Sequence, residues 1–187
     1  MHKDVVISQF DCFPCDTRDN PKNWYAVYLR SKCEFISKLE LLKKGIDVFL
    51  PTVKLLRQWK DRRKEMDFPL FPGYLFVHIQ ENIEARVQVL KTRGVVCLLS
   101  SSSGSPIPVP SSEIKNLVLV TRGERQLDVY THLKEGHRVR VCRGPLEGAE
   151  GILHKKCANN TCLFVVNVEI LGRCVGINIH ADDIEPA

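Results

Sequence analysis

The last third of the chain consists of short β-like segments, and no long helical stripe occurs in it. These segments span residues 137–142, 151–154, 162–168 and 174–179, and glycine, proline or asparagine residues separate them. Turn residues at such intervals are typical of a small antiparallel barrel. Valine and isoleucine are abundant in this part and disfavour helix, so we predict a constitutive β-barrel.

The preceding hundred residues alternate between helical and strand patterns. Ser31 and Glu34 have the spacing of a capping box, and Gly45 is the stop signal of the helix that follows. Further helices are predicted over residues 83–90 and from residues 110–113 onward, where the last helix opens. The apolar residues at helical spacing in the first helix are Phe35, Ile36, Leu39 and Leu42. Strands are predicted over residues 24–29, 48–50, 53–59, 66–68, 73–79 and 95–99, and a loop over 100–110.

This order of elements predicts an α+β fold in which helices flank a mainly antiparallel sheet and a small five-stranded β-barrel follows. We expect an irregular or disordered tail over residues 1–21 and the mixed domain over residues 22–120. A linker without clear periodicity is expected over residues 121–131, and the barrel over residues 132–187.

The positive charge of the chain is confined to its middle. The whole chain has a formal net charge of +5, residues 21–121 hold 16 basic and 9 acidic side chains, and residues 131–187 hold 7 of each. A field of that sign attracts phosphate, so the middle segment is a candidate for nucleic-acid contact. A solvated basic face without a partner is the alternative.

Several classes of protein lack their usual signatures here. The apolar runs are far shorter than the ~20 residues of a membrane span, and the N-terminus has no signal-peptide core, so we expect a cytoplasmic protein without membrane contact. No zinc-protease or phosphate-loop motif occurs, and Cys12-x-x-Cys15 lacks a second pair of ligands. We therefore predict no catalysis, no cofactor and no metal site. The cysteines in apolar segments are expected to be mostly reduced and buried, and they are Cys33, Cys97, Cys142, Cys162 and Cys174.

Two patterns in series give the chain a family resemblance. The first comprises Trp24-Tyr25-Ala26-Val27, Phe71-Pro72-Gly73-Tyr74-Leu75-Phe76-Val77, Thr92-Arg93-Gly94-Val95 and Pro106-x-Pro108-Val109-Pro110. The second is Gly136-x-x-Val139-x-Val141-x-x-Gly144-Pro145-Leu146-x-Gly148-x-x-Gly151-Ile152. The first resembles the NusG N-terminal domain, and the second resembles a KOW motif, the signature of a small five-stranded barrel. Together they cover residues 22–187, so the whole arrangement resembles a NusG-like factor.

The resemblance implies a processivity factor for bacterial RNA polymerase that has no catalytic activity of its own. In the family, the N-terminal domain packs an apolar patch onto the clamp helices of the largest polymerase subunit and keeps the clamp closed. Binding only the closed state suppresses pausing. The barrel domain recruits a further partner, such as the termination factor Rho or a small-subunit ribosomal protein. We expect the factor to be a monomer.

The polymerase-binding patch of the family carries over onto aromatic residues of the predicted sheet and apolar residues of the last predicted helix. These residues are Tyr28, Tyr74, Phe76, Ile114, Leu117 and Val118. Aromatic anchors suit such a patch because they bury a large area with few rotatable bonds. The alternative is that they are ordinary core residues, since Tyr74 and Phe76 share one face of a strand.

A basic hairpin tip is the candidate element for contact with non-template DNA near the transcription bubble. Its residues are Arg57, Trp59, Lys60, Arg62, Arg63 and Lys64, and weaker candidates are Arg30, Arg86 and Arg93. Trp59 could stack on an unpaired base. A solvated tip with Trp59 folded back on the sheet is the alternative.

The segments at 69–76, 92–95 and 108–110 resemble specialised antiterminators of the UpxY and RfaH kind, which act on long operons. We therefore favour an antitermination factor for specific operons over a general NusG-type factor that couples polymerase to Rho or the ribosome. A ribosome-associated KOW RNA-binding protein is the second alternative, but its barrel would be expected to be basic. Ala85-Arg86-Val87 stands where RfaH has a polar His-Thr motif, so that contact is not expected.

Overall fold

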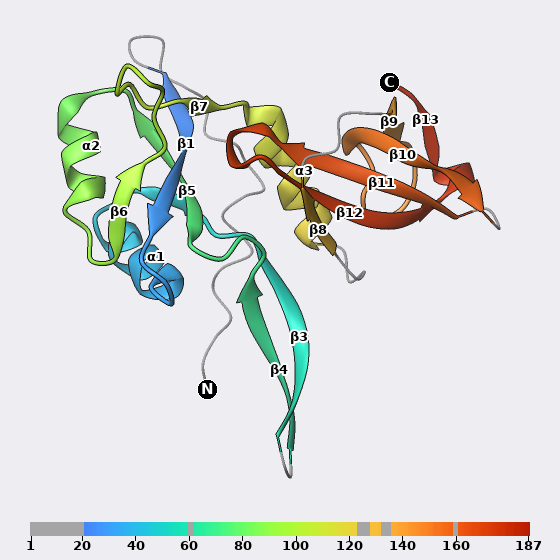
Figure 1. Cartoon of the computed structure of the whole chain (residues 1–187), viewed down its shortest axis with the longest axis horizontal. Coiled ribbons are helices and arrows are strands. Elements are labelled where there is room, and N and C mark those ends of the chain that lie inside the picture. The colour runs from blue at the N-terminus through green and yellow to red at the C-terminus, as the bar shows by residue number, and fades with distance from the viewer. Residues whose placement is uncertain (1–20, 60–61, 123–127, 132–135, 159–160) are drawn as a thin grey trace.

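The computed structural model describes residues 21–59, 62–122, 128–131, 136–158 and 161–187, with the backbone alone at 56–59, 62–64, 128–131 and 155–158. Two larger antiparallel sheets, a separate two-stranded hairpin and several helices make up these residues (Figure 1). The α+β prediction is therefore confirmed. None of the helices described is long and apolar enough to cross a membrane.

The N-terminal sheet has the strand order β2-β5-β1-β6, and β7 pairs with the first half of β1. Its strands are β1 (Lys22–Leu29), β2 (Asp47–Phe49), β5 (Tyr74–Gln80), β6 (Val95–Leu98) and β7 (Pro108–Val109). The prediction of a loop throughout residues 100–110 is wrong at β7. Since β6 pairs only with Val27 to Leu29, the first half of β1 offers an open edge, which β7 fills.

Strand β1 is apolar on both faces because both faces of the sheet are covered. Tyr25 and Val27 belong to a core that includes Leu41 and Val89, whereas Trp24 and Ala26 belong to a second core. The covering helices are α1 (Glu34–Lys43), α2 (Ile83–Leu90) and α3 (Ser111–Arg122). Helices α1 and α2 contribute to the first core and α3 contributes to the second. A central strand buried on both sides explains the unbroken apolar run of residues 24–29.

Helix α1 does not begin with the predicted capping box. Cys33, not Ser31, is the residue before the first turn, and its side chain makes no capping hydrogen bond. Glu34 is only 6% exposed, and its carboxylate accepts a hydrogen bond from the backbone N–H of Gly73 at 2.9 Å. The Glu34 side chain therefore bonds to a residue far away in the sequence, whereas a capping box would use it at the start of its own helix.

Helix α1 also buries a mostly polar face. Glu34, Ser37 and Leu41 point inward, and the Ser37 hydroxyl donates to the carbonyl of Arg93 at 2.7 Å. The apolar stripe that predicted the helix is exposed instead, and Leu39 reaches 60% exposure. The other members of this stripe are Phe35, Ile36 and Leu42. Spacing therefore identified the helix, but the buried face is set by hydrogen bonds to distant backbone.

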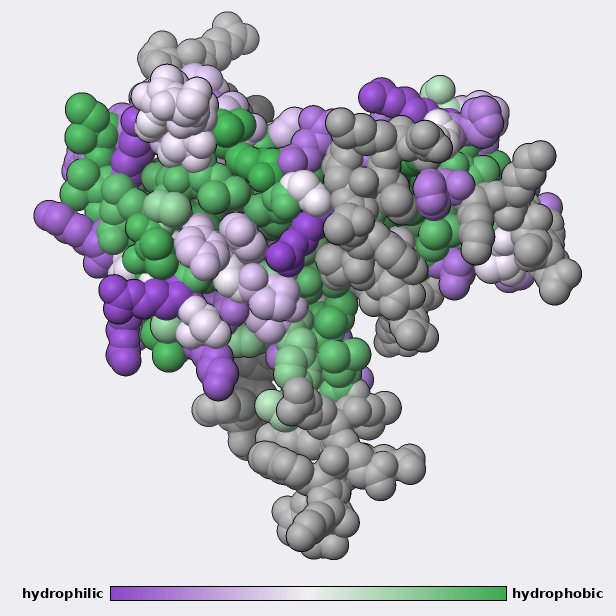
Figure 2. Space-filling model, in the orientation of Figure 1, coloured by the Kyte–Doolittle hydropathy of each residue, from purple (hydrophilic) through white to green (hydrophobic). Residues whose placement is uncertain are grey.

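Helix α2 presents its apolar stripe to the surface as well. Asn82 caps the helix by accepting a hydrogen bond from the N–H of Ala85 at 2.7 Å. Val89 is the buried residue of the helix, while Ile83, at 79% exposure, faces outward. Figure 2 shows hydrophobic side chains gathered on the surface over α2 and β6.

Strands β3 (Thr52–Trp59) and β4 (Arg62–Pro69) pair with each other as a two-stranded hairpin. The hairpin extends away from both larger sheets (Figure 1). The second arm begins at Arg62 and not near Met66, so the predicted tip is shorter than expected. Residues 62–64 pair with residues 57–59 because the antiparallel ladder continues almost to the turn.

The C-terminal sheet has the order β13-β9-β10-β11-β12-β8. Its strands are β8 (Asp128–Thr131), β9 (His137–Val141), β10 (Glu150–Ala158), β11 (Thr161–Val168), β12 (Arg173–His180) and β13 (Ile184–Pro186). Strands β9 to β13 provide the five strands expected of the barrel. Strand β8 lies in the segment expected to be a linker, and it joins the sheet by pairing with β12.

Gly151 shows why glycine is required at one point of the C-terminal sheet. A Cβ atom at this position would lie 2.5 Å from the carbonyl oxygen of Val165 and 2.7 Å from the ring of Phe164. Phe164 is fully buried in the core of this sheet. The glycine therefore lets β10 approach β11 over the largest side chain of that core.

The expectation of reduced, buried cysteines is only partly correct. Cys174 is a buried free thiol, as expected. Cys162 is buried but disulfide-bonded. Cys97 is a free thiol at the surface, and Cys33 and Cys142 are half-buried free thiols. A disulfide requires two sulfurs to meet in the fold, which an apolar pattern cannot reveal. Cys12 and Cys15 lie outside the described residues, as does the expected tail up to residue 20.

Candidate protein and nucleic-acid interfaces

Tyr28 and Tyr74 form an aromatic pair at one end of the N-terminal sheet. They are cross-strand partners on β1 and β5, with ring centroids 5.3 Å apart and a tilt of 46° between the rings. Tyr28 is 41% exposed and Tyr74 is half-buried. The pair therefore gives this end of the sheet an accessible aromatic surface, which we call the tyrosine surface.

A tight turn before β5 holds this pair in place. Gly73 has a φ of +82°, which favours glycine, and its carbonyl accepts a hydrogen bond from the N–H of Leu29 at 2.8 Å. The Glu34 carboxylate accepts the N–H of Gly73 from the other side. The turn is thus tied to both β1 and α1, and the start of β5 has a defined position beside Tyr28.

The other four predicted polymerase-binding residues are buried. Phe76 is fully buried and stacks with Phe49 at a centroid distance of 6.1 Å. Ile114, Leu117 and Val118 recur at i, i+3 and i+4 on α3, which packs against β1. These four residues belong to the core that joins α3 to the sheet, and they support the tyrosine surface from beneath.

Two of the predicted arginines lie where the end of β1 meets the start of β6. Arg30 follows β1 directly, and its backbone N–H donates to the carbonyl of Gly94 at 2.8 Å. Arg93 precedes that glycine, and its backbone N–H donates to the Glu40 carboxylate at 3.1 Å. Both arginine side chains are exposed. Arg30 therefore lies two positions beyond Tyr28, and the backbone of Arg93 is tied to α1.

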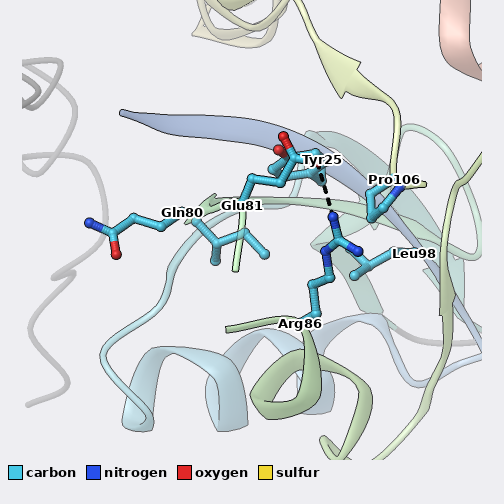
Figure 3. Close-up of a pocket in the computed structure, with 7 residues that line it drawn as sticks. Tyr25, Gln80, Glu81, Arg86, Leu98 and Pro106 are labelled. Atoms are coloured by element: carbon cyan, nitrogen blue, oxygen red, sulfur yellow. Dashed lines mark hydrogen bonds and ion pairs between the residues drawn. The ribbon is translucent and has the colours of Figure 1, made fainter. Parts of the chain in front are cut away.

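Arg86 has a different environment from the other arginines. It reaches from α2 toward Tyr25 and Pro106, and it pairs with the Glu81 carboxylate at 3.0 Å (Figure 3). Burial, more than the nearby Glu81 carboxylate, raises the pKa of Tyr25 in the same cluster. The Arg86 side chain is 30% exposed and already pairs with a carboxylate, so it is a weaker candidate for contact with nucleic acid than Arg30 or Arg93.

The hairpin brings the remaining basic candidates together near its tip. Arg57 is the cross-strand partner of Lys64, and Trp59 is the partner of Arg62. Arg63 lies opposite Gln58, and Lys60 falls outside the described residues. The antiparallel register thus gathers residues that are up to seven positions apart in the sequence.

Sequence patterns missed one residue at the tyrosine surface. Arg173, at the start of β12, places its guanidinium carbon 5.8 Å from the centroid of the Tyr74 ring. This distance is within the range of a cation–π contact. No local signal marks Arg173, because the contact joins positions 99 residues apart, counted from 74 to 173.

Comparison with known proteins identifies the group to which the chain is related. The family described as NusG, transcription termination factor nusG, matches residues 22–118, which is more than half of the 187 residues. The chain belongs to the NusG family. The matched region contains the N-terminal sheet, the hairpin and most of α3, so the tyrosine surface lies within the shared domain.

Individual NusG relatives align with nearly the whole chain. The transcription termination/antitermination protein NusG of Borreliella burgdorferi is 27% identical over 185 residues, covering 87% of this chain and 97% of the relative. The NusG protein of Haemophilus influenzae is 22% identical over 182 residues, covering 91% and 97%.

A solved structure titled "Domain interaction in Thermotoga maritima NusG" is 24% identical, with a TM-score of 0.52, and covers 88% of this chain and 97% of that chain. This likeness supports the two-sheet fold.

Proposed function

We propose that this chain is a transcription termination/antitermination factor that binds bacterial RNA polymerase through the tyrosine surface. The observation that carries the proposal is the exposed Tyr28 beside Tyr74, within the domain that matches the NusG family. Large aromatic side chains with few rotatable bonds are typical anchors of protein interfaces. Arg30 and Arg93, whose side chains are exposed, stay weaker candidates for contact with DNA.

The proposed partner surface is the pair of clamp helices of the largest polymerase subunit. A factor that binds only the closed clamp shifts the equilibrium toward the closed state and opposes pausing. A preference of about 1.4 kcal/mol for the closed state changes this equilibrium tenfold. The factor itself needs no catalytic group for this effect, and we expect it to act as a monomer in the cytoplasm.

We propose non-template DNA near the bubble as the partner of the hairpin. Its basic residues lie on a projecting element, where they can reach a strand beside the polymerase. Contacts to phosphates provide affinity without reading sequence. Trp59 would stack on an unpaired base.

We further propose that the factor acts on specific long operons. A general NusG-type role is the alternative. The segments 69–76 and 92–95 favour the specialised role by their resemblance. The names of the relatives from Borreliella and Haemophilus favour the general one. A map of neighbouring genes separates the two, since polysaccharide genes would support the first and translocase or ribosomal genes the second. In either case the C-terminal sheet would recruit Rho or a small-subunit ribosomal protein.

Replacement of Tyr28 tests polymerase binding. Tyr28→Ala should weaken binding to core RNA polymerase by about 1–3 kcal/mol, which is roughly 5- to 150-fold, because an interface anchor is removed. Affinity is measured by titration of fluorescently labelled protein. Phe35→Ala is the matched control, since Phe35 is 42% exposed on α1 against 41% for Tyr28. Equal affinities of the two variants would refute the assignment, and co-purification with ribosomal subunits in place of polymerase would favour a ribosome-associated protein.

A further inference from the structure

We infer that the exposed apolar strip of α1 is a docking surface for residues 1–20 of this same chain. The strip consists of Phe35, Ile36, Leu39 and Leu42. It lies on the side of the N-terminal sheet opposite the tyrosine surface, because α1 packs on the core that contains Tyr25 and Val27. The inference therefore does not depend on the proposed binding of polymerase.

The strip is a continuous apolar surface on a single helix. Its four side chains are between 38% and 60% exposed. Phe35, Leu39 and Leu42 recur at i, i+4 and i+7, so they follow one another along the helix over about 10 Å. Single exposed apolar residues are ordinary, whereas a contiguous group of them marks a surface that binds another apolar segment.

Residues 1–20 join the fold close to one end of the strip. Lys22, the first residue of β1, donates from Nζ to the carboxylate of Asp47 at 3.2 Å, at the start of β2. Lys22 and Gly45 line the same pocket. Gly45 lies just beyond the end of α1, and its backbone N–H donates to the carbonyl of Leu42 at 3.0 Å. The entry point of the chain is therefore beside the end of α1 that carries the last member of the strip.

The same twenty residues contain apolar side chains and enough chain length to reach the strip. The apolar residues are Val5, Val6, Ile7, Phe10 and Phe13. An extended chain advances about 3.3 Å per residue, so the nine positions from Phe13 to Lys22 span up to about 30 Å. This reach exceeds the ~10 Å length of the strip, so the two phenylalanines can lie on Leu39 while Lys22 keeps its place in β1.

The charges of the two surfaces are complementary. Residues 1–20 hold four aspartates against one lysine and one arginine. Lys38 and Lys43 flank the strip, since each lies one helical turn from one of its members. The two carboxylates of α1, on Glu34 and Glu40, each accept a hydrogen bond from a distant backbone N–H. The edge of the strip is therefore cationic, and it suits an apolar segment that carries negative charge.

The exposed apolar residues of α2 are the competing site for residues 1–20. They begin at Ile83, close to the same entry point, because β5 leads into α2 and its last residue pairs with the first residue of β1. Glu81 and Glu84 flank Ile83 in the sequence and are exposed, and Arg86 offsets only one of these two charges. Acidic residues repel an acidic segment, so α1 is favoured and α2 provides the control.

Cross-linking of the full-length chain with a carbodiimide tests the inference. This reagent joins a carboxylate to a lysine in direct contact, so it should link an aspartate of residues 1–20 to Lys38 or Lys43, and peptide mass spectrometry identifies the pair. Leu39→Ser should weaken docking about tenfold, since burial of a leucine side chain is worth roughly that factor. The yield should then fall by about half if docked molecules outnumber undocked ones by about ten to one in the wild type. Ile83→Ser, an equally conservative change at an exposed site on α2, is the matched control and should leave the yield unchanged.

Variants of residues 1–20 complete the test. Phe10→Ser combined with Phe13→Ser should lower the yield as Leu39→Ser does, and all three changes together should lower it little further, because they remove the same contact. A yield that depends on Ile83 and not on Leu39 would place the segment on α2 and overturn the inference. Cross-links that form only between differently isotope-labelled copies would make the strip a contact between two chains. Absence of the cross-link, or a yield that neither serine variant changes, would show that the strip does not bind residues 1–20. Thermal unfolding verifies that each variant remains folded.

Discussion

At the scale of single residues, the tyrosine surface depends on a polar residue that is not part of it. Glu34 is buried on α1, and its carboxylate accepts the N–H of Gly73 in the turn that starts β5. A buried backbone N–H without an acceptor is costly, so this bond stabilises the turn. Glu34 belongs to a helix that covers the opposite face of the sheet. Its hydrogen bond therefore helps to fix the position of Tyr74 beside Tyr28.

Replacement of Glu34 is expected to affect both stability and polymerase binding. Glu34→Ala leaves the N–H of Gly73 without its acceptor and should lower the free energy of unfolding by about 1–3 kcal/mol. Glu34→Gln keeps an acceptor oxygen and should reduce stability much less. Chemical denaturation measures stability, and titration with polymerase measures binding. An alanine variant as stable as the glutamine variant would show that the bond contributes little.

Residue identities were only partly predictable at this surface. Tyr28 and Tyr74 were expected there from the resemblance, and the structure places both at one accessible edge. Their role in binding remains a prediction. Phe76 was expected beside them, but its strand position turns it under α3, where it is buried. Arg173 could not be expected, since only the docking of the C-terminal sheet brings it to Tyr74.

At the scale of elements, the hairpin of β3 and β4 concentrates positive charge away from the rest of the protein. Its cross-strand register pairs Arg57 with Lys64 and Trp59 with Arg62. Like charges opposite each other destabilise a hairpin, so this arrangement is costly without an anionic partner. The proposed contact of the hairpin with DNA would offset this cost.

Charge reversal at the hairpin tests binding to DNA. Arg62→Glu combined with Arg63→Glu should reduce pause suppression and its dependence on salt, while affinity for core polymerase without nucleic acid changes little. For every phosphate that the variant no longer binds, the slope of log affinity against log salt should become shallower by about 0.7 for a single strand. Lys43→Glu combined with Lys91→Glu, at exposed helix ends, is the control pair. If polymerase affinity falls while pause suppression is unchanged, the hairpin contacts polymerase and not DNA.

Element types were easier to predict than element orientation. Helices α1 and α2 were expected from their apolar spacing, and both exist, but their stripes face the solvent. Periodicity specifies which residues share a face, whereas the direction of that face depends on tertiary contacts. In α1 these contacts are the bonds of Glu34 and Ser37 to distant backbone.

At the scale of the whole molecule, α3 is the element that both sheets share. One of its faces packs on the N-terminal sheet and another on the C-terminal sheet. The expected linker of residues 121–131 is occupied at its described ends by the last turn of α3 and by β8. The two parts of the chain are therefore in direct contact, and not only connected by a free segment.

Docking of the two sheets should depend on pH through Glu113. Burial at the contact raises the pKa of this carboxyl from an ordinary 4.5 to about 7, and the nearby Glu169 carboxylate adds to the rise against the opposing effect of the Glu169 N–H bond. Detachment would expose Glu113 and return its pKa toward the ordinary value. The docked form therefore binds a proton more tightly, so this contribution is complete below about pH 4.5 and disappears as pH rises through about 7.

The expected result is a larger detached fraction at pH 8 than at pH 6, measured as the difference in tumbling time between the sheets. Glu113→Gln is neutral at both pH values and retains an acceptor for the N–H of Glu169. This variant should therefore abolish most of the pH dependence. If the pH dependence of the detached fraction is unchanged in this variant, groups other than Glu113 cause it.

The amino-acid sequence by itself determined the local character of this protein. Apolar residues in an unbroken run specify a central strand, glycines with positive φ or close neighbours specify turns and strand approaches, and abundant valine and isoleucine specify an all-β C-terminal part. These properties depend on near neighbours in the chain.

Tertiary structure alone decided which helix faces are exposed, which aromatic residues stay accessible, and how the C-terminal sheet lies on α3. The physical reason is that burial and hydrogen bonding are satisfied between positions far apart in sequence, such as Glu34 with Gly73 and Arg173 with Tyr74, where no local pattern records the partner.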